Sequence, residues 1–103
     1  MVRPYNCIWE FEVTPEHRAE FEHVYGPGGS WVQLFRRSPG HIETLLLKHE
    51  SVAGRYLTID RWQSKEAYLA FRLRFAGPYA QLDAECKHLA VSERVVGIFS
   101  ECG

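Results

Sequence analysis

The sequence has no long apolar run, no excess of charge of one sign and few cysteines. No stretch approaches the ~18 apolar residues that a membrane span needs, and no apolar signal segment follows the first residues. Twelve basic and thirteen acidic side chains give a net charge of -1, with no basic cluster larger than Arg36-Arg37. We therefore expect neither nucleic acid nor a membrane as a partner. Cys7, Cys86 and Cys102 are too widely spaced for a disulfide framework, which favours reduced thiols and a cytoplasmic location.

The five histidines do not indicate a metal site. His17 and His23 are six residues apart on one predicted helix, so they point to different faces. His41, His49 and His88 have no spacing typical of metal ligands. We expect no metal, and we expect His41, directly after a Pro-Gly turn, to be the histidine that faces a pocket.

Hydrophobic residues make up 46% of the chain and aromatic residues 14%, which is typical of a folded protein with a sizeable core. A chain of 103 residues has room for one such core, so residues 1–103 are predicted to form a single domain. We expect a small apolar or aromatic ligand rather than a charged polymer.

Hydrophobic periodicity predicts strands separated by helices. Alternation at period two and apolar runs indicate strands over residues 5–13, 41–48, 55–62 and 93–100. Thr14-Pro15 is typical of a helix start, Ser30 begins a short helix, and Ser64 begins a long helix interrupted at Gly77-Pro78. With right-handed crossovers, this order predicts an α+β fold, the ferredoxin-like split βαβ sandwich, with a four-stranded antiparallel sheet and helices on one face.

Helices on one face would leave the other face of the sheet open. The strands nevertheless carry apolar or aromatic residues on both faces, notably Ile8, Tyr56, Trp62 and the run 45–47, and the second strand is apolar enough to be buried on both sides. A twofold-related copy packed sheet against sheet would cover such a surface. The sequence therefore predicts a homodimer through the open face.

Several segments resemble the antibiotic biosynthesis monooxygenase superfamily of dimeric α+β barrel proteins. They are Trp9-Glu10-Phe11-Glu12-Val13, Ser38-Pro39-Gly40-His41, Tyr56-Leu57-Thr58-Ile59-Asp60-Arg61-Trp62, and Ser64-Lys65-Glu66-Ala67-Tyr68 with Phe71. The resemblance covers nearly the whole chain. It implies a dimer and either oxygenation of polycyclic phenols without a cofactor, haem degradation, or a protein without activity.

The resemblance also implies catalytic positions. Asn6 and Trp62 match the Asn and Trp of the haem-degrading branch, but Arg72 stands where that branch has a His. Haem iron needs an axial ligand such as His, whereas an Asn, a Trp and an Arg line the pocket of the phenol-oxidising branch. Asn6, Trp62 and Arg72 are therefore the candidate catalytic residues, and no cofactor is expected.

A cofactor-free oxygenase has to deprotonate a phenol and hold the anion in a dry cavity with aromatic walls. The candidate substrate-binding residues are Trp31, His41, Tyr56, Phe71 and Phe75. Phe71 and Phe75 have ordinary core spacing on a helix, and Asn6 is equally compatible with a plain polar residue at a strand start. Asp60 and Arg61 point to opposite faces of their strand, and a buried Asp60 is either a general base or a structural carboxylate.

Two functions remain open from the sequence. One is a monooxygenase-like enzyme acting on an aromatic or polyketide-type small molecule. The other is a non-catalytic homodimer that binds a small ligand or assists a partner. The motifs identify a fold more strongly than they identify a reaction.

Overall fold

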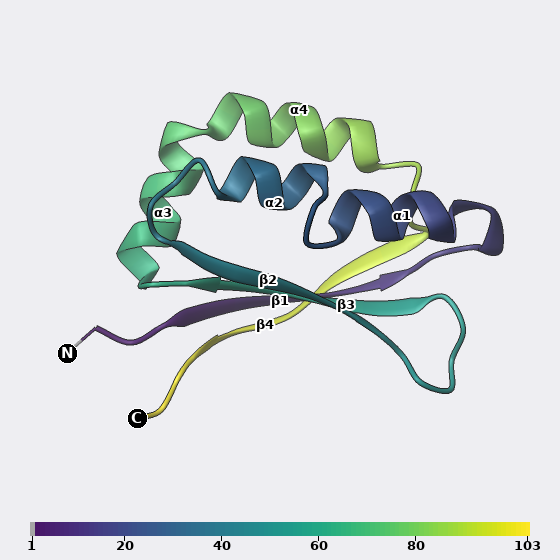
Figure 1. Ribbon diagram of the computed structural model, residues 1–103, viewed down its shortest axis with the longest axis horizontal. Coiled ribbons are helices and arrows are strands. Elements are labelled where there is room, and N and C mark those ends of the chain that lie inside the picture. The colour runs from purple at the N-terminus through teal and green to yellow at the C-terminus, as the bar shows by residue number, and fades with distance from the viewer. Residues whose placement is uncertain (1) are drawn as a thin grey trace.

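A computed structural model describes residues 2–103. Four strands form one antiparallel sheet in the order β2-β3-β1-β4, namely β1 (Tyr5–Glu12), β2 (His41–Lys48), β3 (Arg55–Trp62) and β4 (Ser92–Ser100). All helices lie on one side of this sheet (Figure 1). This is the ferredoxin-like α+β fold that the sequence predicts.

The helical layer consists of a 3-10 turn and four α-helices. They are η1 (Pro15–His17), α1 (Arg18–Tyr25), α2 (Ser30–Phe35), α3 (Lys65–Arg74) and α4 (Ala76–Cys86). The predicted start at Pro15 is therefore a 3-10 turn that leads into α1. Among residues 2–103, no helix is long and apolar enough to cross a membrane.

The break between α3 and α4 comes slightly earlier than the sequence predicts. α3 ends at Arg74 and α4 begins at Ala76, so Gly77 and Pro78 lie inside the first turn of α4. Proline has no N–H to donate to the carbonyl four residues earlier, and its ring clashes with that carbonyl. The continuous helix therefore ends one turn before Pro78, and α4 turns to cover the sheet.

Strand register sorts the side chains onto two faces. Each pair of directly opposed residues shares a face. The helix-covered face carries successive rows that include Trp62 with His41, Asp60 with Thr44, and Thr58 with Trp9. The core on this side is largely aromatic, with Phe11, Phe21, Tyr25, Trp31, Phe35, Tyr56, Trp62, Phe71 and Phe75 among its buried members.

The opposite face is open in the single chain. Its central row runs Leu45, Ile59, Ile8 and Gly97 from β2 to β4, and Leu47 with Leu57 lies one row further. Leu45 and Leu47 are 40% and 44% exposed. The prediction that β2 is buried on both sides therefore does not hold within one chain.

Two residues expected on this open face lie elsewhere. Tyr56 and Trp62 are almost completely buried under the helices. They share parity with Thr58 and Asp60 along β3, whereas Leu57 and Ile59 point to the open face. The apolar character of the open face thus comes from aliphatic side chains and from Phe99 on β4, which lies opposite Asn6 and is 52% exposed.

Candidate active site

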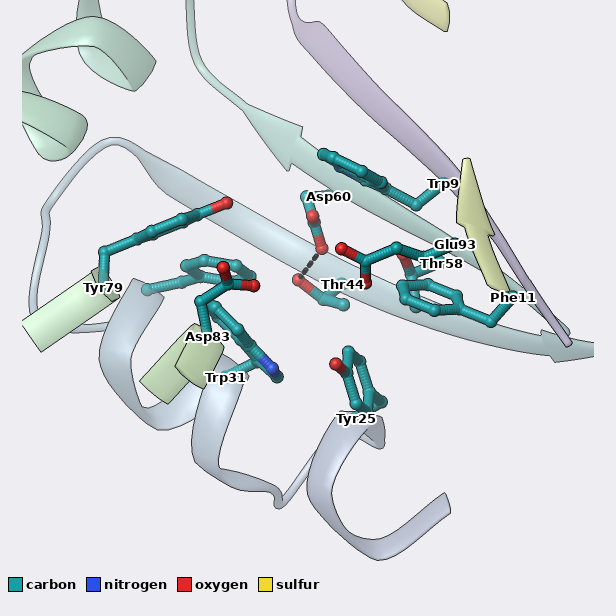
Figure 2. Close-up of a pocket in the computed structure, with 11 residues that line it drawn as sticks. Trp9, Phe11, Tyr25, Trp31, Thr44, Thr58, Asp60, Tyr79, Asp83 and Glu93 are labelled. Atoms are coloured by element: carbon teal, nitrogen blue, oxygen red, sulfur yellow. Dashed lines mark hydrogen bonds between the residues drawn. The ribbon is translucent and has the colours of Figure 1, made fainter. Parts of the chain in front are cut away.

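A pocket opens between the helical layer and the sheet (Figure 2). Its cavity volume is about 50 Å³, and its walls come from all four strands and from α1, α2 and α4. Six aromatic side chains line it, together with two threonines and three acids: Trp9, Phe11, Tyr25, Trp31, Phe35, Tyr79, Thr44, Thr58, Asp60, Asp83 and Glu93. One water needs ~10–15 Å³ of such space, so the closed part holds only a few small groups.

The sheet supplies the floor of the pocket through strand register. Asp60 lies opposite Thr44 on β2 and Cys7 on β1, and Thr58 lies opposite Trp9 one row further. Alternation along β3 turns both Thr58 and Asp60 toward the helices. The pocket thus lies over the middle of the sheet.

Among the acids of the pocket, Asp60 has the largest shift in pKa. It is 9% exposed, and its Oδ1 accepts a hydrogen bond of 3.0 Å from the Thr44 hydroxyl. Burial raises the pKa of the Asp60 carboxyl to about 7, while the Thr44 hydrogen bond opposes the shift. An acid with this pKa can accept and return a proton near neutral pH.

Thr44 connects Asp60 to His41. The Thr44 hydroxyl lies 2.9 Å from His41 Nε2, so donation to Asp60 leaves its oxygen free to accept from that ring nitrogen. Burial, followed by the charge of Arg36, lowers the pKa of His41 below its usual value. A neutral imidazole at the start of β2 therefore supports the Thr44 and Asp60 geometry.

Two acids lie nearer the solvent. Asp83 on α4 is half-buried, and Glu93 on β4 is exposed. Partial desolvation of the Glu93 carboxyl beside the pocket, and then the charge of Asp83, raise its pKa, with Lys87 opposing the shift. Asp83 and Glu93 therefore act on one another electrostatically at the mouth of the pocket.

The phenol groups around the pocket stay protonated at neutral pH. Burial raises the pKa of Tyr79 to about 12, with the charge of Arg72 opposing the shift. Burial likewise raises the pKa of Tyr25. Asp60, by contrast, exchanges a proton near neutral pH.

Asn6 lies on the opposite face of the sheet from the pocket. Its side chain donates to the Phe99 carbonyl at 3.3 Å and to Glu101 at 3.1 Å. Arg61 holds the same Glu101 carboxylate at 2.8 Å and also pairs with Glu43. Asn6 is therefore part of a polar network on the open face. This network includes Arg61, which follows Asp60 in β3 and points to the other side of the sheet.

Trp62 and Arg72 do not line the pocket either. Trp62 is fully buried against Phe35 and Phe71, and within residues 2–103 its indole N–H has no hydrogen-bond partner. Arg72 donates to the Tyr68 hydroxyl at 2.9 Å, and its guanidinium lies 3.9 Å from the centre of the Tyr79 ring. Arg72 thus contacts the pocket wall from outside.

Among the five predicted substrate-binding residues, Trp31 lines the pocket. His41 reaches it only through Thr44. Tyr56 hydrogen-bonds to Glu22 beneath α1 at 2.5 Å. Phe71 and Phe75 are core residues on and just after α3, in line with their ordinary helical spacing.

Sequence reasoning missed most of the pocket. Asp83, Glu93 and Tyr79 lie on elements distant in sequence from β3, and no local pattern links them to that strand. Asp60 is a candidate base from the sequence, and its parity along the strand, the same as that of the predicted site residue Trp62, places it on the same face.

A family model for antibiotic biosynthesis monooxygenases matches residues 4–74, from the residue before β1 to the end of α3. The chain belongs to this family. The matched region of the antibiotic biosynthesis monooxygenase fold contains Thr44 and Asp60, whereas Asp83 and Glu93 lie beyond it. No curated protein matches the chain.

Solved structures with this fold include oxygenases. SnoaB from Streptomyces nogalater, a cofactor-independent oxygenase, superposes with a TM-score of 0.76 at 22% identity over 99% of this chain and 96% of its own. A putative antibiotic biosynthesis monooxygenase from Nitrosomonas europaea gives 0.73 at 12% identity over 98% and 92%. A possible oxidoreductase from Bacteroides thetaiotaomicron gives 0.72 at 13% identity over 98% and 100%. At these identities the likeness establishes the fold and leaves the substrate open.

Proposed function

We propose that this protein is a cofactor-independent monooxygenase acting on an aromatic or polyketide-type small molecule, with Asp60 as its general base. The observation that carries the proposal is a buried carboxyl with a pKa of about 7 inside an aromatic-walled pocket. Perturbed acids in a cleft are typical of acid–base catalysis. Membership of the antibiotic biosynthesis monooxygenase family supports the reaction class.

In this proposal, Asp60 takes a proton from a carbon or oxygen acid of the substrate. The electron pair left on the substrate anion forms a carbon–oxygen bond with dioxygen, and the resulting peroxide anion takes back the proton from Asp60. Loss of water from the hydroperoxide leaves a carbonyl group, so one oxygen atom enters the product and the other leaves as water. The aromatic walls exclude bulk water from the anion.

Oxygen consumption with a panel of phenols and anthrones tests this function. Replacement of the base by an amide, Asp60→Asn, keeps an oxygen that accepts from Thr44 and removes proton transfer. We expect kcat to fall by about 10²-fold or more. Glu66→Gln, at an exposed position on α3, is the control and should leave turnover unchanged. Equal turnover by Asp60→Asn and the wild type would exclude Asp60 as the base.

The pH profile of kcat/KM tests the same assignment. Activity should be low at acidic pH and rise to a plateau above about pH 7, because only the carboxylate accepts a proton. Cys7, Tyr68 and Tyr79 near Asp60 have raised pKa values and keep their protons in this range, and burial lowers the pKa of His41. Glu93 at the mouth also has a raised pKa, so the profile is measured for Glu93→Gln as well, and the rise should persist in that variant. A flat profile would contradict the proposal.

The second candidate is a non-catalytic small-ligand-binding protein. It is favoured by the separation of the three residues that the resemblance marks as catalytic: Asn6 lies on the open face, while Trp62 and Arg72 lie outside the pocket lining. Ligand binding without oxygen consumption across the panel would support this reading.

We further propose that the protein associates as a homodimer through the open face of the sheet. The aliphatic row of Leu45, Ile59 and Ile8 would be covered by the same row of a second copy. The pocket lies on the other side of the sheet, so this association leaves its mouth open.

A further inference from the structure

All ionisable carboxyl, amine, guanidine and imidazole groups that line the pocket are acids. Asp60 from β3, Asp83 from α4 and Glu93 from β4 converge on it, and no Lys, Arg or His is among the eleven lining residues (Figure 2). Asp60 lies at the buried end, with Asp83 half-buried and Glu93 exposed at the mouth. A ligand that enters therefore passes two carboxylates before it reaches a third.

These three acids differ from the paired acids elsewhere in the chain. Within residues 2–103, five other carboxylates lie within 4.0 Å of a Lys or Arg nitrogen, including Glu43 and Glu101 on either side of Arg61. Asp60, Asp83 and Glu93 make no such pair in the part of the chain that the structure describes. The charge of Lys87 acts on Glu93 but forms no ion pair with it within 4.0 Å. Like charges near one another without a paired cation repel, and a bound cation would relieve this repulsion.

Asp60 gives an independent indication of a missing partner. The residue is 9% exposed and lines the pocket, yet within residues 2–103 only Oδ1 of its carboxyl has a hydrogen-bond donor, the Thr44 hydroxyl. The second oxygen accepts no hydrogen bond from residues 2–103. Buried carboxylates are ordinarily fully hydrogen-bonded or paired with a cation, so this oxygen is available to a donor on a ligand.

The walls suit an organic cation. Trp9, Trp31 and Tyr79 present electron-rich rings to the pocket, with Phe11, Tyr25 and Phe35 completing the lining. Ammonium groups bind to the faces of such rings, and carboxylates nearby add ion pairing. A neutral polycyclic ligand would contact the rings but leave Asp83 and Glu93 without a cationic partner, and an anionic ligand would be repelled.

We infer that the natural ligand is an aromatic compound carrying a protonated amine, with the ammonium group held between Asp83 and Glu93 and the ring directed toward Asp60. This inference names the substrate class of the proposed oxygenase site and rests on that site binding a small molecule. The two residues assigned to the amine lie outside the region that the family model matches. They would therefore define the substrate of this particular chain rather than the shared chemistry.

Three probes with one phenol ring and different charge test the inference by isothermal titration calorimetry. They are tyramine, which carries an ammonium, the neutral alcohol tyrosol, and the anion 4-hydroxyphenylacetate. At about pH 8 and low salt, we expect tyramine to bind about tenfold more tightly than tyrosol, with no binding of the anion. Added salt should reduce the advantage of tyramine, since part of it is ionic.

The variants Asp83→Asn and Glu93→Gln, alone and combined, locate the effect. The double variant should bind tyramine and tyrosol within about threefold of one another. Glu85→Gln removes one negative charge from the same helix as Asp83 but outside the pocket, and should keep the wild-type preference. Thermal melts confirm that each variant is folded.

Equal binding of tyramine and tyrosol, or failure of all three probes to bind, would overturn the inference. So would a tyramine preference that survives in the double variant. Oxygen consumption separates this test from that of the proposed function. A charge-selective pocket that consumes no oxygen would keep the amine inference and reject the oxygenase, whereas turnover of neutral phenols without amine preference would do the reverse.

Discussion

Asp60, the proposed general base, is also expected to lower the free energy of unfolding. Its carboxyl is buried beside one hydroxyl donor and no cation, which raises its pKa from 3.8 to about 7. Between these values, the folded chain holds a proton that the unfolded chain has released. Stability therefore decreases as pH rises through this window, because the folded state must bury a charge.

The buried, unpaired charge of Asp60 predicts that Asp60→Asn stabilises the protein at about pH 8 while it lowers kcat by about 10²-fold or more. The amide keeps an acceptor for Thr44 and carries no charge, so we expect a gain on the order of a few kcal/mol that disappears near pH 4. Urea unfolding at both pH values measures it. Asp83→Asn, a charge removal at the open mouth of the same pocket, is the control. A less stable Asp60→Asn at pH 8 would mean that the carboxylate is not an uncompensated charge.

The same result would clarify the activity measurements. If a variant loses turnover while its free energy of unfolding increases, the loss of activity is not caused by unfolding and reflects the missing catalytic group. Active sites commonly carry groups that lower stability in exchange for reactivity, and Asp60 has the burial and pKa of such a group.

At the scale of elements, local signals place the helices well. Ser64 is the clearest case: its hydroxyl accepts a hydrogen bond of 3.0 Å from the Ala67 N–H and caps α3. Thr14, also expected as a cap, makes no such bond to the backbone and instead lies 3.3 Å from a His17 ring nitrogen. The chain accordingly starts with a 3-10 turn there.

Removal of the α3 cap should have a measurable and local cost. Ser64→Ala leaves the Ala67 N–H without its acceptor, and we expect a loss of about 1 kcal/mol in the free energy of unfolding. Ser30→Ala is the matched control, because Ser30 is exposed at the start of α2 and makes no side-chain hydrogen bond within the described residues. Similar losses in the two variants, measured by urea unfolding, would show that the cap contributes nothing specific.

Strand and helix order could be predicted from the sequence, because periodicity and capping are local properties. β2 and β3 have the predicted bounds, and β4 begins one residue earlier than predicted. Face assignment could also be read locally: Asn6 alternates with Tyr5 and Cys7, and therefore lies on the face away from the helices.

The pocket could not be predicted in the same way. Asp83 and Glu93 meet Asp60 because α4 crosses the sheet at a position set by the break before Pro78 and by helix packing. Nothing in a local pattern states over which row of the sheet a helix will lie. The resemblance implies Asn6, Trp62 and Arg72 as catalytic residues, but their side chains do not meet in this pocket.

At the scale of the whole molecule, the sheet separates two surfaces with different roles. The covered face holds the pocket. The open face presents aliphatic rows and Phe99, bordered by the Glu43, Arg61 and Glu101 network. A patch of this kind is typical of an association surface. The proposed homodimer would bury it.

Ile59→Arg tests that association, since Ile59 is the centre of the aliphatic row between Ile8 and Leu45. A buried guanidinium facing its own copy across a twofold axis has no partner, so the variant should be a monomer by light scattering after size-exclusion chromatography. Leu73→Arg, at an 84% exposed position on α3, should remain a dimer. A wild-type monomer, or a dimeric Ile59→Arg, would refute the proposed interface.

The length of the hairpin between β2 and β3 determines which side chains of β3 face the pocket and which face the open surface. Gly54 closes its turn with φ of 83°, a conformation that other residues rarely adopt, and β3 follows directly. Insertion or deletion of one residue here would invert the strand, placing Arg61 in the pocket and Asp60 on the outer surface. Lineages derived from this chain should therefore diversify by substitution along β3, while the length of the hairpin stays constant.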